Sequence, residues 1–236
     1  MITRISLLFA TVFAATAFSQ DISPSPKRGL VYVPSSAHPT DDNIWIHNGS
    51  DLTWYYTYGT TPANAFQNSQ MQFVPMMWGA PSGGADDTTF LAEVEGLISN
   101  GQNLSYVLTF NEPDGSSASG GSNITPNYAA RLWATNIEPL KQKYGLRLGA
   151  PACTGAPSGF DWLTQFFGNC SGNCSADFIP LHWYGNFEGL ASHVGQYRAA
   201  YPNASIWVTE YADANDAVAG TQAFFNESAA WFDSLE

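Results

Sequence analysis

Tyr106-Val107-Leu108-Thr109-Phe110-Asn111-Glu112-Pro113-Asp114 begins as the apolar run of a buried β-strand and then turns polar. A second stretch, Ser205-Ile206-Trp207-Val208-Thr209-Glu210-Tyr211, has the same arrangement. Each predicted strand carries a glutamate at its C-terminal end. In a β/α barrel these ends form the rim on which functional residues gather, so the two stretches predict a pair of carboxylates, Glu112 and Glu210, at one rim.

Around these stretches, β-type runs alternate with helical runs, which is typical of a parallel sheet covered by helices. Seven strands are expected, at about residues 28–33, 52–58, 72–78, 105–111, 146–151, 178–184 and 205–211. A closed barrel of this type needs eight. We therefore expect an α/β fold, a (β/α)8 TIM-type barrel that lacks the eighth strand, in one catalytic domain over residues 20–236 that is truncated at its C-terminal end. An open seven-stranded α/β sheet is the alternative.

Two helices have sequence signals at both ends. The first has an apolar face from Phe90 to Ile98, and we expect an aspartate, Asp86 or Asp87, to open it and Gly101 to close it. The second is expected to begin with Thr125 as its N-cap and a proline at the first helical position, and to end before a glycine. Pro139 should kink or restart this second helix.

The composition is acidic and apolar. Of the 236 residues, 44% are hydrophobic and 12% are charged, which favours a globular protein over a disordered one. The net charge of -12 repels phosphate backbones and anionic lipids. We therefore expect neither nucleic acid nor a membrane as a partner, and we expect the protein to be a monomer.

Residues 1–19 have the form of a secretory signal peptide, with a basic start, an apolar run and small residues before a cleavage point. The apolar run is shorter than the ~20 residues of a membrane-spanning helix. Secretion agrees with seven Asn-x-Ser/Thr sequons, at Asn48, Asn103, Asn123, Asn169, Asn173, Asn203 and Asn226. We expect a secreted protein, located outside the cell or in the cell wall.

Three cysteines are an odd number for a secreted chain. Cys170 and Cys174 lie in a flexible Gly/Asn/Ser segment and are expected to form a disulfide, while Cys153 follows an apolar run and is expected to be a buried thiol. The four histidines have none of the spacings of zinc sites, and no phosphate-binding glycine motif follows a strand. We expect no metal and no cofactor.

The carboxylate pair suits hydrolysis of a glycosidic bond, in which one carboxyl protonates the leaving oxygen and the other attacks the sugar carbon. Asn111 could donate its side-chain amide to a sugar 2-hydroxyl, or could instead cap the loop. His182 and Tyr184 alternate on the sixth predicted strand, so both could face Glu210, although His182 could also be a core residue.

Sugar rings bind to aromatic platforms interleaved with polar groups. Strand aromatics more often belong to the core, so each candidate has that alternative. Position favours binding for those at C-terminal strand ends, which are Tyr58, Trp78 and Tyr211. Trp54, Tyr56 and Trp183 are the further candidates.

The chain resembles the fungal members of glycoside hydrolase family 128, which are retaining clan A enzymes with β/α barrels. The resemblance rests on residues 109–114, His182-Trp183-Tyr184, Trp207-Val208-Thr209-Glu210-Tyr211 and the strand Trp54-Tyr55-Tyr56-Thr57-Tyr58. It implies that Glu112 is the acid/base and Glu210 the nucleophile.

The same resemblance implies a secreted endo-β-1,3-glucanase that hydrolyses laminarin or fungal cell-wall glucan by double displacement, through a glycosyl-enzyme intermediate. Two alternatives stay open. One is a non-catalytic β-1,3-glucan-binding protein of the same fold, and the other is a retaining clan A hydrolase that acts on another β-glycan.

Overall fold

The computed structural model describes residues 25–235 of the chain, so the predicted signal peptide at residues 1–19 lies outside the described residues. The fold is α/β, as predicted, and a strand lies at each of the seven expected positions. The strands are β1 Gly29–Val31, β2 Trp54–Tyr56, β3 Gln72–Phe73, β4 Tyr106–Asn111, β5 Arg147–Ala152, β6 Phe178–Tyr184 and β7 Ser205–Ala212. The helices are α1 Thr89–Ser99, α2 Pro126–Leu132, α3 Glu138–Tyr144, α4 Pro157–Cys170, α5 Phe187–Ala200 and α6 Val218–Ser234.

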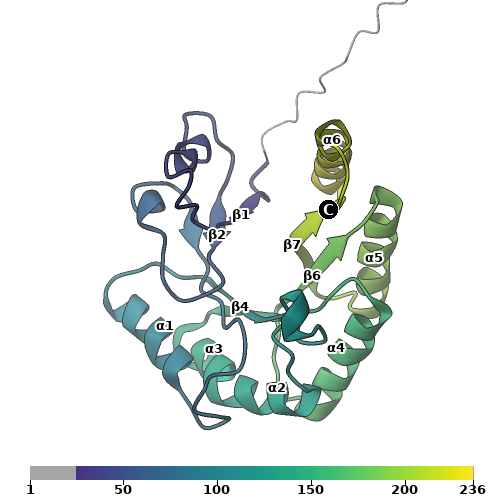
Figure 1. The fold of residues 1–236 in the computed structure, drawn as a ribbon. Coiled ribbons are helices and arrows are strands. Elements are labelled where there is room, and N and C mark those ends of the chain that lie inside the picture. The colour runs from purple at the N-terminus through teal and green to yellow at the C-terminus, as the bar shows by residue number, and fades with distance from the viewer. Residues whose placement is uncertain (1–24, 236) are drawn as a thin grey trace, which may run out of the picture.

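All strand pairs are parallel, and the strands form two sheets that follow each other in chain order, β1-β2-β3 and β4-β5-β6-β7. A single bridge, Met76 to Leu108, joins the sheets, and the Met77 amide donates to the Leu108 carbonyl at 3.0 Å. Within residues 25–235 no strand pairing joins β1 to β7. The helices lie outside the strands, and β1 and β7 face each other across an opening (Figure 1).

Short helical turns complete the connections between the main elements. They are the 3-10 turns η1 Asp41–Ile44, η2 Asn64–Phe66 and η3 Ser117–Ser119, and the π-helical turn η4 Trp133–Ile137. None of the helices in the described part of the chain is both long and apolar enough to cross a membrane.

The helix ends follow the sequence signals with one exception, because Thr88, and not Asp86 or Asp87, is the N-cap of α1. The Asp87 carboxylate accepts a hydrogen bond from the Thr89 amide at 2.8 Å at the start of α1. Thr125 is the N-cap of α2, as predicted, with an extended backbone and a proline after it, although its side chain makes no capping hydrogen bond. Pro126 at the first turn, with its fixed φ, is sufficient to start α2. The predicted restart at Pro139 is confirmed, because α2 passes through η4 before α3 begins at Glu138.

The apolar core has two parts, one on each face of the sheets. The larger part packs the strands against the helices. The smaller part contains only residues from strands and the turns beside them, and Trp207 lies at its centre with Trp54, Tyr106 and Phe178 at ring distances of 4.9, 5.0 and 4.3 Å. These four rings, here called the aromatic floor, come from the N-terminal halves of their strands. They fill the space beneath the C-terminal strand ends.

The cysteines occur in both expected forms. Cys170 and Cys174 form a disulfide with their Cα atoms 5.5 Å apart, which closes the end of α4. Cys153 is a buried free thiol, and burial, with the charges of Asp114 and Glu112 as smaller causes, raises its pKa well above the ordinary value.

Charged groups connect the two sides of the opening between β1 and β7. The Arg28 guanidinium, at the start of β1, contacts the carboxylate of Asp51 and, at 2.5 Å, that of Asp233 in α6. The Lys27 ammonium donates to the Phe232 carbonyl at 3.3 Å and to the Leu235 carbonyl. The first strand is therefore attached to the last helix without strand pairing.

Replacing Arg28 with methionine should lower the free energy of unfolding by about 1 kcal/mol, because two partly buried ion pairs are lost while the apolar stem is kept. Chemical denaturation of the Arg28→Met variant measures this. Arg131→Met, on the exposed face of α2, is the matched control. Equal stability of the two variants would contradict a role for Arg28 in holding the opening together.

Candidate active site

Glu112 and Glu210 lie close together at the C-terminal ends of β4 and β7, and His182 of β6 lies between them. The His182 Nδ1 atom is 3.0 Å from Glu112 Oε1, and its Nε2 atom is 3.6 Å from Glu210 Oε1. One ligand-type atom from each of the three side chains falls within 4.8 Å of the others. The imidazole is buried, with 1% of the residue exposed. The predicted meeting of these three residues at one rim is what the structure shows.

The backbone of Glu112 adopts an unusual conformation. Its φ is +42°, in the left-handed region that side chains other than glycine rarely adopt. Its amide donates to the Ala152 carbonyl at 2.7 Å, and its carbonyl accepts from the Gly115 amide at 2.8 Å. A Cβ atom on Gly121 would lie 2.6 Å from the same carbonyl, so glycine is required there. Strain of this kind is held by surrounding structure and concentrates at functional sites.

A β-bulge directs Glu210 into the site. Leu181 pairs with Val208 but the next residue of β6, His182, pairs with Glu210, which leaves Thr209 as an extra residue in β7. Without the bulge, Glu210 would alternate to the face opposite Trp207 and point at the helices. The extra residue turns the carboxylate towards the same interior as the aromatic floor.

Three tyrosine hydroxyls donate to the Glu210 carboxylate. Tyr58 and Tyr56, from the β2 region, donate to Oε1 at 2.6 and 3.3 Å, and Tyr184 of β6 donates to Oε2 at 2.9 Å. Burial, and then the charge and hydrogen bonding of Glu210, raises the pKa of all three phenols well above the ordinary value. The three hydroxyls therefore remain hydrogen-bond donors, and they fix the orientation of the Glu210 carboxylate.

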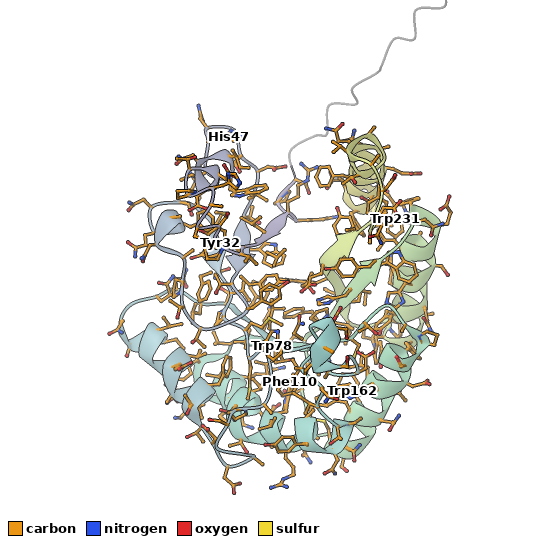
Figure 2. All side chains as sticks on the ribbon, in the orientation of Figure 1. Tyr32, His47, Trp78, Phe110, Trp162 and Trp231 are labelled. Carbon is orange, nitrogen blue, oxygen red and sulfur yellow. A yellow bond between two sulfur atoms is a disulfide. The ribbon has the colours of Figure 1, made fainter. Side chains whose placement is uncertain are left out.

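A pocket of about 380 Å³ opens above the two glutamates. Its lining is formed by Tyr58, Trp78, Asn111, Glu112, Ser119, Gly120, Tyr184 and Glu210. A second hollow of about 220 Å³ adjoins it and shares Tyr58 and Trp78 as walls. Trp78 is 40% exposed and lies within the ring of helices and strands (Figure 2).

The predicted amide of Asn111 lies at the pocket wall but is partly engaged. Its Nδ2 atom donates to the Gly120 carbonyl at 3.1 Å, which leaves one amide hydrogen for another acceptor. Its Oδ1 atom is buried and has no hydrogen-bond partner in the described part of the chain. Asn111 therefore holds the loop through Gly120, as one prediction expected. It also lies at the pocket wall, where the other prediction places a sugar-binding amide.

Besides Tyr56, three of the aromatic residues predicted to bind sugar do not line the pocket. Trp183 alternates with its neighbours in β6, so it faces outward and packs on His193 at 5.2 Å between ring centroids. Tyr211 follows Glu210 and for the same reason faces α6, where it packs on Phe224 at 5.7 Å. Trp54 faces inward but lies at the base of its strand, in the aromatic floor.

Sequence reasoning named Tyr56 as a sugar-binding candidate but not as a hydrogen-bond donor to Glu210, and it missed Ser119 and Gly120. Tyr56 had a usable signal, because it alternates between Trp54 and Tyr58 and so shares their face. Ser119 and Gly120 come from the loop after β4, which has no periodic pattern. Glu112, His182 and Glu210 are a possible ligand set for a cation, and the expectation that no metal binds stays a prediction.

With this geometry in hand, comparison with known proteins identifies the class. The family model described as glycosyl hydrolase catalytic core matches residues 29–236. The chain belongs to this family and, within it, to glycoside hydrolase family 128.

Among solved structures, the chain is similar to a curdlan-specific exo-β-1,3-glucanase of Blastomyces gilchristii in complex with glucose, with 28% identity, a TM-score of 0.72, and coverage of 90% of this chain and 87% of that one. An endo-β-1,3-glucanase of Amycolatopsis mediterranei, in complex with laminaritriose and laminaribiose, has 28% identity and a TM-score of 0.63 over 89% of this chain and 85% of that one. An oligosaccharide-binding protein of Trichoderma gamsii has 26% identity and a TM-score of 0.63 over 78% and 72%.

Among curated proteins, the chain is similar to alkali-sensitive linkage protein 1 of Schizosaccharomyces pombe, with 31% identity over 195 residues. The match covers 82% of this chain and 32% of that protein, so the chain spans about a third of the length of this relative.

The raised phenol pKa values predict a loss of stability at high pH. Above pH ~10 the unfolded chain releases phenolic protons that the folded protein keeps, so the free energy of unfolding falls as the pH rises. The Tyr56→Phe variant should fall less steeply, by up to about 1.4 kcal/mol per pH unit for the one proton removed. Urea denaturation between pH 9 and 11 measures the two slopes, and identical slopes would contradict protonation of Tyr56 in the folded state.

Proposed function

We propose that this chain hydrolyses β-1,3-glucan as an endo-β-1,3-glucanase with a retaining, double-displacement mechanism. The observation that supports this most directly is the approach of Glu112 and Glu210 oxygens to within 4.8 Å around His182. Retaining enzymes have carboxyls about 5–5.5 Å apart, whereas inverting enzymes leave about 6.5–9.5 Å for a water molecule. The short separation suits attack by one carboxylate on the sugar.

Glu210 is the proposed nucleophile, because three hydroxyl donors hold its carboxylate in a fixed orientation. It attacks the anomeric carbon and forms a glycosyl ester while the bond to the leaving oxygen breaks. Glu112, the proposed acid/base, gives its proton to that oxygen and afterwards takes one from the water that cleaves the ester. His182 holds Glu112 beside the reacting bond through its contact at 3.0 Å.

The substrate class follows from the pocket wall and from the relatives. Trp78 and Tyr58 offer ring faces for apolar sugar surfaces, and Asn111 and Tyr184 offer polar groups at the same wall. The two related β-1,3-glucanases belong to the same family. We favour endo action because the second hollow continues the pocket past Trp78 and gives a polysaccharide room to extend.

We also propose that the strands belong to a TIM-type (β/α)8 barrel, in which one further strand would lie between β1 and β7. Support comes from the parallel strand order and from the helices on the outside (Figure 1). Secretion remains part of the proposal, supported by the signal-peptide form of the sequence at residues 1–19 and by the seven sequons.

A β-1,3-glucan-binding protein without turnover is the second candidate, because the Trichoderma gamsii neighbour is an oligosaccharide-binding protein. The presence of both carboxylates, with their full set of hydrogen-bond donors, favours the enzyme.

Incubation of the protein with laminarin should release a series of short β-1,3-oligosaccharides, because an endo enzyme cleaves internal bonds. The Glu210→Gln variant should lose at least about 10³-fold in turnover, since an amide cannot form the glycosyl ester, while calorimetric binding of laminari-oligosaccharides stays near wild type. Glu188→Gln, on the exposed face of α5, is the matched control.

The product series separates the candidates. Release of glucose alone would replace endo with exo action. Tight binding without any product from the folded wild-type protein would overturn the enzyme proposal in favour of the binding protein.

A further inference from the structure

The loop that follows Glu112 is anchored to a neighbouring connection by one carboxylate. Asp114 Oδ1 accepts a hydrogen bond from the Thr154 amide at 2.9 Å. Its Oδ2 accepts from the Thr154 hydroxyl and, at 3.3 Å, from the Ser158 hydroxyl. All three donors lie in the segment that connects β5 to α4 or in the first turn of α4, so Asp114 joins two connections at the same rim.

The space around this anchor is tight. A Cβ atom on Gly159 would lie 2.4 Å from the Thr154 carbonyl and 3.3 Å from Asp114 Oδ2, so glycine lets the first turn of α4 pack closely on the connection that binds Asp114. The start of α4 at Pro157 also directs the positive end of the helix dipole towards the carboxylate. Packing and electrostatics thus both favour this position for Asp114.

Glu112 is the residue that needs such an anchor. Its left-handed backbone costs on the order of 1–3 kcal/mol and persists only where the surroundings hold it. The Glu112 amide bonds to the Ala152 carbonyl at the end of β5, and the Glu112 carbonyl accepts from the Gly115 amide within the turn itself. Asp114 lies two residues after Glu112. Its side chain accepts hydrogen bonds from Thr154 and so binds this turn to the β5–α4 connection.

We propose that Asp114 is a positioning residue for Glu112, and that it acts by fixing the loop in the conformation that directs the acid/base carboxyl towards His182 and the pocket. The inference rests on the proposed function and deepens it. Asp114 itself does not line the pocket, so it acts through Glu112 and not on the substrate.

The position predicts which part of the reaction suffers when the anchor is lost. A displaced Glu112 no longer delivers its proton to the leaving oxygen, whereas Glu210 and its tyrosine donors stay in place. A glycoside with a very good leaving group, such as 2,4-dinitrophenolate, departs without protonation and so does not need the acid. General damage to the fold would slow both kinds of substrate equally.

The test compares kcat/KM of Asp114→Ala on laminari-oligosaccharides and on 2,4-dinitrophenyl β-laminaribioside. We expect a loss of about 10²-fold on the oligosaccharides, the effect of a misplacement of about 1 Å, and a value close to wild type on the dinitrophenyl glycoside. Glu112→Ala provides the reference pattern for loss of the acid. Asp161→Ala, on the exposed face of α4, removes the same charge from a nearby position and should change neither value.

Equal losses on both substrates, or no loss on either, would overturn the positioning role. Asp114→Asn keeps an acceptor for the Thr154 amide and should recover part of the oligosaccharide rate. If thermal unfolding shows that Asp114→Ala does not fold, Thr154→Val, which removes one donor, decides by the same comparison of substrates. A wild-type protein inactive on both substrates would instead overturn the proposed function.

Discussion

The hydrogen bonds of the Glu210 carboxylate join the two sheets on the side of the molecule where β1 and β7 face each other. Glu210 belongs to β7, whereas Tyr56 and Tyr58 approach it from the β1–β3 sheet across the opening where strand pairing is absent within residues 25–235. The Tyr56 hydroxyl shares its one proton between Glu210 and the Thr209 carbonyl, which lies 3.1 Å away, so the bulge residue is held by the same tyrosine. A carboxylate that accepts hydrogen bonds from several donors is held firmly in place. Orientation of Glu210 and cohesion of the two sheets therefore depend on one set of hydrogen bonds.

Three other parts of the structure support the hydrogen bonds of Glu210. The aromatic floor fills the interior on the N-terminal side of Glu210. The Glu210 side chain therefore has no space to turn towards the N-terminal strand ends. Lys27 and Arg28 hold β1 to α6 at the edge of the same opening. On the opposite wall, the left-handed Glu112 and the Asp114 anchor present the second carboxylate. The site is thus assembled from both sheets, and neither sheet carries it alone.

Much of this was predictable from sequence, because apolar periodicity identifies strands and strand ends identify a rim. The seven strand positions, the helix restart at Pro139 and the meeting of Glu112, His182 and Glu210 follow from such patterns. The face on which Tyr211 lies could not be predicted in this way. A bulge at Thr209 changes the alternation of side chains along β7, and no sequence pattern indicates it. The wall formed by Ser119 and Gly120 was also unpredictable, since its conformation depends on contacts in the loop after β4 and not on a periodic pattern.

The most direct test of the central claim, that Glu210 attacks the sugar while Glu112 handles the proton, is to capture the covalent intermediate. An activated 2-deoxy-2-fluoro β-laminaribioside slows hydrolysis of the glycosyl ester more than its formation, and peptide mass spectrometry locates the attached sugar. The account predicts a labelled peptide in which the sugar is bound to Glu210. Attachment to Glu112, or hydrolysis of laminarin with inversion and no labelled enzyme, would contradict it.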